Sequence, residues 1–425
     1  MQNVSFRGSQ FNKRLIMVQL RDYQTEIATK GVIALNTYGL VYLAMQPRTG
    51  KTLTALTMAK YVFAQNVLFV TKKKAIKSIE TDFEKSEYSY NLTVINYESL
   101  HKISWSFDLI IIDEAHCCGA YPKPNKRAKQ LKQLSINKPI IYLSGTPTPE
   151  SYSQIFHQLY ISSANPFRKY PTFYKWAKEF VNVKQKNIGY GLVNDYDDAN
   201  IGKIKMYTDS FWFDYTQQEA GFKSTIDENI IEVELEESTY RLIDRLKKDL
   251  VVEGTTEVIL ADTAVKLQSK LHQLYSGTIK FESGKTQVLD HSKIESILSR
   301  FKETKIVIFY KFIAELESIK KYYLNDVTTD LEEFNSTDKS IALQIVSGRE
   351  GLNLSKAKYI VYFNIDFSAT SYWQSRDRLT TIDRPSNTVF WIFAKKGIER
   401  AIYKAVMNKK SFTTSHFKNF LKNGI

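Results

Sequence analysis

Two carboxylates stand directly after an apolar run in the stretch FDLIIIDEAHCCG, residues 107–119. The unbroken run at 109–112, rich in β-branched residues, is typical of a strand that is buried on both faces of a parallel sheet. Ligands collect at the carboxyl ends of such strands, but adjacent acids such as Asp113 and Glu114 resist joint ionisation. A magnesium ion bound by Asp113, beside a water polarised by Glu114, would remove this conflict. Taken alone, the pair is explained equally well by a strand end followed by a solvated turn.

A second candidate site lies at Gly50, Lys51 and Thr52, within a stretch that predicts a strand, a loop and a helix at 38–62. In a phosphate-binding loop, backbone N–H groups at a helix N-terminus cradle phosphates, a lysine reaches the outer phosphates and a hydroxyl holds magnesium. Met45 stands where the first glycine of the full pattern belongs, so a chance GKT at the start of a helix is the alternative for this motif alone. If the strands before the lysine and before the acids share one parallel sheet, both sites lie at the same edge. Together they supply what phosphoryl transfer from a nucleotide to water needs.

The composition is that of a globular chain with an excess of positive charge. Lys and Arg number 59 against 45 Asp and Glu, a net charge of +14, which predicts a polyanionic partner. Charge alone does not separate nucleic acid from an acidic membrane surface. The N-terminus lacks the apolar core of a signal peptide, and no apolar run approaches the ~18 residues that span a bilayer. We therefore expect a cytoplasmic protein without a membrane partner.

Cysteine and histidine suggest no metal chemistry. Cys117 and Cys118 are the only cysteines, and neighbours in sequence rarely satisfy disulfide geometry. They are expected to be small buried residues in a reducing compartment. The six histidines are scattered and predict no zinc site.

Short apolar, β-rich runs alternate with helical stretches throughout the 425 residues, which predicts parallel sheets built from strand-helix-strand units. The runs fall in two series and predict two sheets in two domains, residues 1–225 and 226–425. An aromatic and basic stretch near 160–215 is predicted to be an insertion in the first domain, and a strand followed by a helix is expected from Glu228. The other expected strands lie at 38–45, 66–70, 92–97, 108–113 and 139–145, and at 305–310, 341–346, 359–364 and 388–393.

Further motifs connect these sites to a known family. LRDYQ (20–24) precedes the phosphate loop and LSGTP (143–147) follows the acids, and with DEAH (113–116) the order resembles that of a superfamily 2 helicase motor. Residues 292–312 are similar to the entry of the second motor domain in the chromatin-remodeller branch of that superfamily. Residues 347–406 look like its late motifs, which end in a Q-x-x-x-R-x-x-R-like string.

The resemblance spans nearly the whole chain, from Leu20 to Ala405, with six motifs in the family's order. It implies an α/β fold of two tandem RecA-like parallel-sheet domains, with ATP and Mg²⁺ in the cleft between them and nucleic acid across their top. The short chain carries no recognisable accessory domain, which is typical of the compact motors that viruses and phages encode. Such a protein would act in the host cytoplasm.

The resemblance also implies roles for single residues. Gln24 would read the adenine, and the phosphate loop would contribute Arg48, Thr49, Gly50, Lys51 and Thr52 to nucleotide binding. Catalysis would fall to Lys51, to Asp113 as the metal ligand with Thr52, and to Glu114 as the base that activates water. Coupling between the domains would fall to His116, Ser144, Thr146, Gly351 and Gln374. For a lone histidine the alternative is a satisfied core residue.

The last motif departs from the family pattern at one position. Arg378 matches its first arginine, whereas Thr381 stands where a second arginine would reach across the cleft to the γ-phosphate. Arg376 or Arg384 could substitute for it. Losing such an arginine costs ~10³ or more in turnover, so slow hydrolysis is an open alternative.

Nucleic-acid contacts are implied at the family's other motifs, at Lys72, Lys73, Lys74, Asn96, Tyr97, Tyr310, Lys311 and Ser347. For the lysines, a solvated face is the alternative. The aromatic stripe at 173–176 would stack on bases or pack in the core, and core packing is the preferred interpretation. Trp373 is expected to be a wedge or a core residue. Because the contacts of such motors go mainly to phosphates, little sequence specificity is expected.

The leading hypothesis is an ATP-dependent DNA helicase or translocase, a nucleic-acid-stimulated ATPase that moves on duplex or branched DNA. The remodeller-like late motifs favour duplex tracking over strand separation. Two alternatives stay open. One is an RNA helicase, because DEAH also marks RNA motors, and the other is a nucleotide-gated DNA-binding protein with little turnover, because of Thr381.

Overall fold

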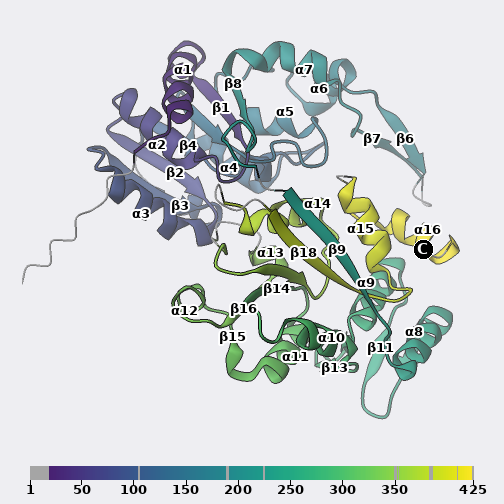
Figure 1. Cartoon of the computed structure of the whole chain (residues 1–425). Coiled ribbons are helices and arrows are strands. Elements are labelled where there is room, and N and C mark those ends of the chain that lie inside the picture. Colours follow the sequence, from purple (N-terminus) through teal and green to yellow (C-terminus); the bar gives the residue numbers. More distant parts are fainter. Residues whose placement is uncertain are drawn as a thin grey trace, which may run out of the picture.

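The computed structural model describes residues 19–103, 106–187, 191–223, 225–348, 352, 354–381, 386–408 and 410–423. Within them the chain forms two lobes, the first half of the sequence above and the second half below in Figure 1. Each lobe is built around one six-stranded sheet, and all paired strands in both sheets run parallel. The predicted fold of two parallel-sheet domains is confirmed.

The first sheet has the strand order β3-β2-β4-β5-β1-β8. Every residue of β1, β4 and β5 is buried, because strands covered on both faces leave no position for a polar side chain. The five strands expected in this half are present, and the edge strand β8 is not predicted by the sequence. The strands are β1 (Leu40–Met45), β2 (Asn66–Thr71), β3 (Asn91–Asn96), β4 (Leu109–Ile112), β5 (Ile140–Leu143) and β8 (Trp212–Tyr215).

Helices connect these strands and cover the sheet. Helix α1 packs against both α2 and β1, which places the helix of the LRDYQ motif beside the phosphate loop. The helices of this lobe are α1 (Asp22–Tyr38), α2 (Lys51–Tyr61), α3 (Ile76–Ser86), α4 (Lys126–Leu134) and α5 (Gln154–Leu159).

The aromatic and basic stretch after α5 extends the first lobe. Phe173 and Trp176 are buried among other rings of the first core, so the interpretation as core packing is confirmed for them, whereas Tyr174 is exposed. The segment also forms an antiparallel β6-β7 hairpin that the sequence does not predict. Its elements are α6 (Phe173–Phe180), β6 (Lys184–Asn187), β7 (Leu192–Asp195) and α7 (Ile201–Thr208).

The second sheet has the order β15-β16-β14-β17-β18-β9. The predicted strands of this half are all present, and β9 begins close to the strand expected at Glu228. The strands are β9 (Thr225–Val233), β14 (Ile306–Tyr310), β15 (Val327–Thr328), β16 (Ser340–Gln344), β17 (Tyr359–Tyr362) and β18 (Ser386–Ala394). The helices are α8 (Glu237–Asp249), α9 (Ala264–Tyr275), α10 (Ser292–Phe301), α11 (Ile313–Tyr323), α12 (Leu331–Ser336), α13 (Ile345–Gly348), α14 (Ala369–Ser375), α15 (Glu399–Met407) and α16 (Thr414–Asn423).

Both faces of this second sheet are covered, and the alternation along β14 shows how. Val307 and Phe309 belong to one apolar cluster, together with residues of α8, α9 and α15, whereas Ile306 and Ile308 belong to another, together with residues of α10 and α11. Successive side chains of a strand point to opposite faces. The strand is therefore apolar at every position for the same reason as β4.

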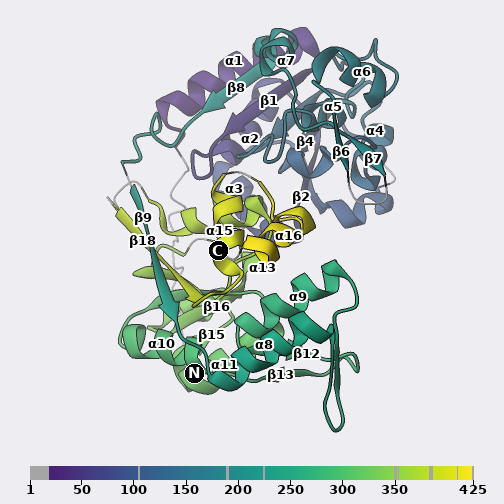
Figure 2. The same cartoon turned by 90° about the vertical axis from the view of Figure 1, so that its right-hand side faces the viewer.

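The second lobe also contains two short antiparallel hairpins. In one, β10 (Val251–Glu253) pairs with β11 (Val258–Leu260), and in the other, β12 (Thr278–Lys280) pairs with β13 (Thr286–Val288). Three-residue strands leave no readable period in the sequence, so they are not predicted. In the turned view of Figure 2 the connection between the lobes runs from the end of β8 to the start of β9. No described helix is long and apolar enough to cross a membrane.

The cysteine prediction is half right. Cys118 is buried, Cys117 is only partly buried, and neither is in a disulfide. Burial raises the pKa of the Cys118 thiol far above its ordinary value, so this side chain stays neutral and inert.

Candidate nucleotide site between the two lobes

Gly50 shapes the loop that follows β1. Its φ of 81° lies in the left-handed region, and it caps α2 at a helix N-terminus for which no side-chain cap is described. A Cβ on Gly50 would lie 1.9 Å from Nε2 of Gln24, so only glycine fits. An uncapped helix N-terminus with its backbone N–H groups exposed is suited to bind phosphate.

The side-chain amide of Gln24 is hydrogen-bonded to this loop. Its Nε2 donates to the carbonyl oxygen of Thr49 at 3.1 Å, and its Oε1 accepts from the backbone N–H of Arg21 at 2.9 Å. Tyr23 Oη also donates to Thr49 O, at 2.9 Å. Gln24 and Thr49 are both buried, so the adenine-reading role of Gln24 stays a prediction while its loop-supporting contacts are visible.

Asp113 follows β4 and is held in one orientation. Its Oδ2 accepts a hydrogen bond from Thr71 Oγ1 at 2.8 Å, and the buried Tyr97 hydroxyl donates to its backbone carbonyl. The other carboxylate oxygen, Oδ1, is buried without a hydrogen-bond partner in the described part of the chain. Burial, and then the charge of Glu114, raises the pKa of Asp113 to about 6. A buried, unpaired carboxylate oxygen beside a hydroxyl-bearing phosphate loop fits a magnesium ligand.

Thr71 is a site residue that the motifs do not reveal. It ends β2, and because Val70 pairs with Ile112 in the parallel register, Thr71 lies beside Asp113. The sequence signal was available in principle: a polar residue at the end of an apolar strand, next to the strand that carries the acids.

Glu114 is held as an anion. Its backbone φ is 51°, a left-handed conformation that turns the chain sharply after the strand. Burial opposes its ionisation, but four positive side chains outweigh burial and lower its pKa to about 2. They belong, in order of decreasing effect, to His116, Lys51, Lys72 and Arg378. With so low a pKa, Glu114 is better suited to orient and polarise a water than to accept its proton early.

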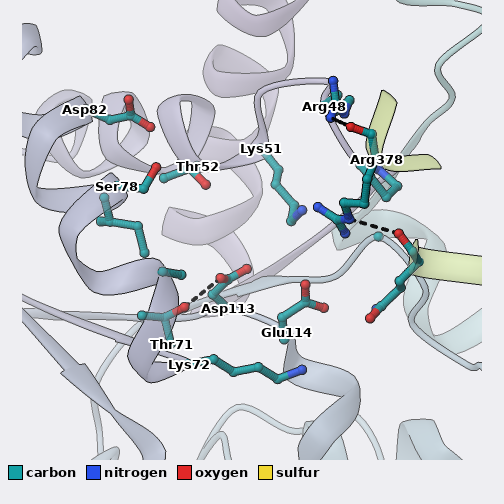
Figure 3. Close-up of a pocket in the computed structure, with 15 residues that line it drawn as sticks. Arg48, Lys51, Thr52, Thr71, Lys72, Ser78, Asp82, Asp113, Glu114 and Arg378 are labelled. Atoms are coloured by element: carbon teal, nitrogen blue, oxygen red, sulfur yellow. Dashed lines mark hydrogen bonds between the residues drawn. The ribbon is translucent and has the colours of Figure 1, made fainter. Parts of the chain in front are cut away.

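These groups line one cavity of about 140 Å³, to which both lobes contribute (Figure 3). From the first lobe, Lys51 and Thr52 come from the start of α2, and the two acids from the end of β4. From the second lobe, Arg378 reaches in, its Nε donating to the carbonyl of Gln374 at 2.9 Å. Figure 3 shows the Lys51 ammonium directed toward the acids. The arrangement concentrates positive charge around two carboxylates, as a metal-nucleotide complex requires.

The other arginines named from the last motif are placed differently. Arg376 pairs with Glu228 of β9 and lies over the ring of Trp373, 4.0 Å from its centroid, and it does not line the cavity around Lys51. Glu228 also accepts hydrogen bonds from Tyr372, Trp391 and Tyr403. Arg384 and Gly351 lie outside the described residues.

A chain of polar contacts leads from Glu114 into the second lobe. His116 Nδ1 lies 3.2 Å from Glu114 Oε2 and 3.0 Å from Ser144 Oγ. Ser144 Oγ accepts from the backbone N–H of Thr146 at 3.2 Å, and Gln374 Nε2 donates to Thr146 Oγ1 at 3.5 Å. Four of the five predicted coupling residues are therefore brought together. A change at Glu114 has a continuous polar route to the second lobe.

The predicted nucleic-acid residues of the first lobe do not form one surface. Lys72 lines the cavity around Lys51, Lys73 is exposed, and Lys74 Nζ donates to the carbonyl of Ser347 in the second lobe at 3.0 Å. Tyr97 is buried, with 1% of its surface exposed, so its ring is not available to a polymer. Asn96 bonds to Glu98 beside it, at 3.2 Å.

In the second lobe, Lys311 follows β14 and pairs with Asp366, and it lies 4.7 Å from the centroid of Phe367. Tyr310 is partly buried against the core. Trp373 is also partly buried, and its Nε1 donates to Val406 O at 3.0 Å, which favours the interpretation as packing over that as a wedge. The nucleic-acid roles of all these residues stay predictions.

The position of Lys72 leads to a prediction. In Figure 3, Lys51 and Lys72 approach Glu114 from opposite sides, so Lys72→Ala is expected to lower phosphate release without any polymer by about tenfold or more, since it removes a charge from the reacting site. Lys85→Ala, on the exposed end of α3, is the matched control. If Lys72→Ala kept the polymer-free rate and weakened only polymer binding, Lys72 would be a nucleic-acid contact instead.

The chain is similar to two solved structures of the Sulfolobus solfataricus SWI2/SNF2 ATPase core. One is of the core domain, at 16% identity and a TM-score of 0.42, covering 98% of this chain and 94% of that chain. The other is of the core in complex with dsDNA, at 17% identity and a TM-score of 0.41, covering 96% and 94%. No curated protein matches the chain.

The family comparison covers more than half of the chain. A family model described as the SNF2-related domain matches residues 51–300, a range that begins at the phosphate-loop lysine and includes both acids. The resemblance inferred from the motifs is confirmed at the level of this family. The chain therefore belongs to the SNF2-related family, and that membership indicates a nucleotide-binding, ATP-hydrolysing enzyme.

Proposed function

We propose that the chain is an ATP-dependent motor that moves along duplex DNA, with residues 1–225 and 226–425 as its two motor domains. The observation that carries the proposal is the shared cavity, where Lys51 and Glu114 of the first lobe face Arg378 of the second. A site completed by both lobes responds to nucleotide by changing how the lobes sit together. Hydrolysis would thus be coupled to movement between the two halves.

The residues present assign the chemical roles. The N-terminus of α2 and Lys51 would bind the phosphates of ATP, and Asp113 with Thr52 would hold Mg²⁺, which neutralises developing charge on the phosphates when bound. Glu114 would orient the attacking water. Arg378 would stabilise negative charge from across the cleft, and the contacts through His116 would report the state of the site to Gln374.

DNA is the proposed polymer because the chain has a net charge of +14 and belongs to the SNF2-related family. Lys73 follows β2 and Lys311 follows β14, so both lie near the carboxyl ends of strands in their sheets. They are candidates for contacts with the phosphate backbone of DNA. Phosphate contacts carry little sequence information, so binding is expected to depend on DNA form and on salt. Duplex DNA is preferred over branched DNA or RNA as the substrate to test first.

A second candidate function is a nucleotide-gated DNA-binding protein with little turnover. It is favoured by Thr381, which stands where the family pattern has a second arginine. Against it, Arg378 already lines the cavity, so one guanidinium is available for the transition state.

The proposal is tested by steady-state phosphate release with no polymer, single-stranded DNA, duplex DNA, a four-way junction and RNA. We expect the strongest stimulation with duplex DNA and no release by Lys51→Ala under any condition. Displacement of a third strand from a triplex would then show movement without strand separation. Stimulation by RNA alone would make the chain an RNA motor, and nucleotide binding without release on any polymer would favour the gated binding protein.

A further inference from the structure

Arg48 occupies an unusual position in the phosphate loop. Its backbone φ is 67°, a left-handed conformation that costs a non-glycine residue of order 1 kcal/mol or more. Glycine would adopt it freely. Such a strained backbone persists only when contacts with the surrounding structure hold it in place. We therefore expect the side chain of Arg48 to make contacts that offset the strain.

That side chain crosses to the second lobe. One terminal nitrogen of the guanidinium donates to the backbone carbonyl of Arg378 and the other to that of Thr380. Figure 3 shows Arg48 and Arg378 side by side at the edge of the cavity, with the bond between them. The carbonyl of Arg378 lies within the 3-10 turn at Arg376–Leu379, and that of Thr380 follows the turn and directly precedes Thr381.

The chemistry of the contact suits arginine and not lysine. Carbonyls at the end of a helical turn have no partner within the turn and attract cations. The planar guanidinium presents two parallel donors to two acceptors, whereas a lysine ammonium is a single point charge. Arg48 is thereby bound through its fork to the backbone of the segment that carries Arg378.

The same contact bears on the position of Arg378. The Nε of Arg378 is bound to Gln374 O at 2.9 Å, which fixes one end of the side chain, while Arg48 fixes the backbone from which it leaves. Other polar contacts between the lobes include Lys74 to Ser347 O at 3.0 Å, and Lys77 to Glu332 at 3.0 Å, the latter with both side chains more than 80% exposed. An exposed pair of that kind contributes little.

We propose that Arg48 is a positioning residue that clamps the phosphate loop to the turn at 376–379 and holds Arg378 in the cavity. The inference rests on the proposed function, because it assigns the effect of Arg48 to the same site. With the clamp supplied by the first lobe, Arg378 would be held in place although Thr381 stands where the family pattern has a second arginine. This role replaces the nucleotide-binding role expected for Arg48 from the motif: Arg48 would act through Arg378 and not as a phosphate ligand.

The test compares Arg48→Gly and Arg48→Lys with the wild type. Arg48→Gly removes the fork and suits the left-handed backbone, so folding is preserved, and Arg48→Lys keeps the charge without the fork. Both are expected to lower kcat for ATP by about 10- to 100-fold, the cost of a misplaced catalytic group. Affinity for a non-hydrolysable ATP analogue is expected to be unchanged. Arg241→Lys, on the exposed face of α8, is the control.

The double variant Arg48→Gly/Arg378→Lys shows whether Arg48 acts by positioning Arg378 or independently of it. If Arg48 acts through Arg378, adding Arg48→Gly to Arg378→Lys lowers kcat no further. Multiplicative losses would overturn the clamp. So would a loss of analogue affinity of about tenfold or more that Arg48→Lys rescues, since that is the signature of a charged phosphate contact.

A readout that needs no turnover keeps the inference apart from the proposed function. In nucleotide-free solution, small-angle X-ray scattering is expected to give a larger radius of gyration for both Arg48 variants than for the wild type. An unchanged radius in both would overturn the clamp, even if the wild type proves to be an active motor. A wild type without phosphate release on any polymer would overturn the proposed function, and the scattering comparison would still decide the clamp.

Discussion

Glu114→Gln is expected to lower ATP turnover by about 10²- to 10⁴-fold while nucleotide binding persists. Glutamine has the same shape and accepts the left-handed backbone to the same degree, but it carries no charge with which to orient and polarise water. It also removes one of two adjacent carboxylates, so the charge repulsion that, after burial, contributes to the raised pKa of Asp113 disappears. The lowered pKa of Glu114 indicates that the surrounding positive side chains stabilise its charge in the folded protein, so loss of that charge is expected to leave folding intact or slightly destabilised.

The measurement is phosphate release with saturating duplex DNA, together with calorimetric binding of a non-hydrolysable analogue. Glu80→Gln is a matched control, because Glu80 is exposed on α3 and changes charge equally. A folded Glu114→Gln protein that hydrolyses ATP at the wild-type rate would exclude Glu114 as the water-activating group. Loss of analogue binding would instead assign Glu114 to ground-state binding.

Lys293→Met is expected to destabilise the second lobe by about 3–5 kcal/mol, because it leaves a buried charge without its partner. Lys293 on α10 and Glu399 at the start of α15 are paired at 2.7 Å, with side chains 1% and 0% exposed. The two helices cover opposite faces of the second sheet. The pair therefore ties together both layers around the strands that carry the late motifs.

Urea-induced unfolding measures this effect, and the double variant Lys293→Met/Glu399→Leu is expected to be more stable than Lys293→Met alone, since no charge is then left unpaired. Removing an exposed charge with Arg241→Met, from a pair whose side chains are 77% and 75% exposed, should leave the midpoint nearly unchanged. A Lys293→Met protein as stable as the wild type would show that water reaches Glu399. A double variant no better than the single one would show that packing, and not charge, dominates at this position.

Local sequence patterns predict those site residues that directly follow buried strands. Lys51 and Thr52 line the same cavity as Asp113 and Glu114, because both pairs follow buried strands of one parallel sheet and parallel strands end at the same edge. Gly50 is required by its left-handed φ, which is a local feature, and by the approach of Gln24 from α1, which is a tertiary contact. Edge strand β8 and the three-residue hairpins have no such signature, because they are short or lack a doubly buried pattern.

Side-chain direction after a strand end was harder to infer. Lys72 and Lys73 are neighbours after β2, yet Lys72 lines the cavity around Lys51 and Lys73 is exposed. Tyr97 follows β3 but is buried beneath the acids. A run of lysines has no period that says which of them turns inward, so contact with nucleic acid and contact with the cavity could not be separated from spacing.

The sequence was sufficient to predict two parallel-sheet domains and to bring Lys51 close to Asp113 and Glu114. Strands that are buried on both faces must be apolar throughout, and charged or glycine-rich motifs are tolerated only where such strands end. The order of the apolar runs and motifs along the chain was therefore enough for this prediction. The tertiary structure alone decided the partners: Arg376 bound to Glu228, Arg378 directed into the cavity, and Arg48 reaching Thr380 across 332 positions of sequence. No local pattern encodes such contacts, because the first depends on packing within the second lobe and the other two depend on how the two lobes are placed.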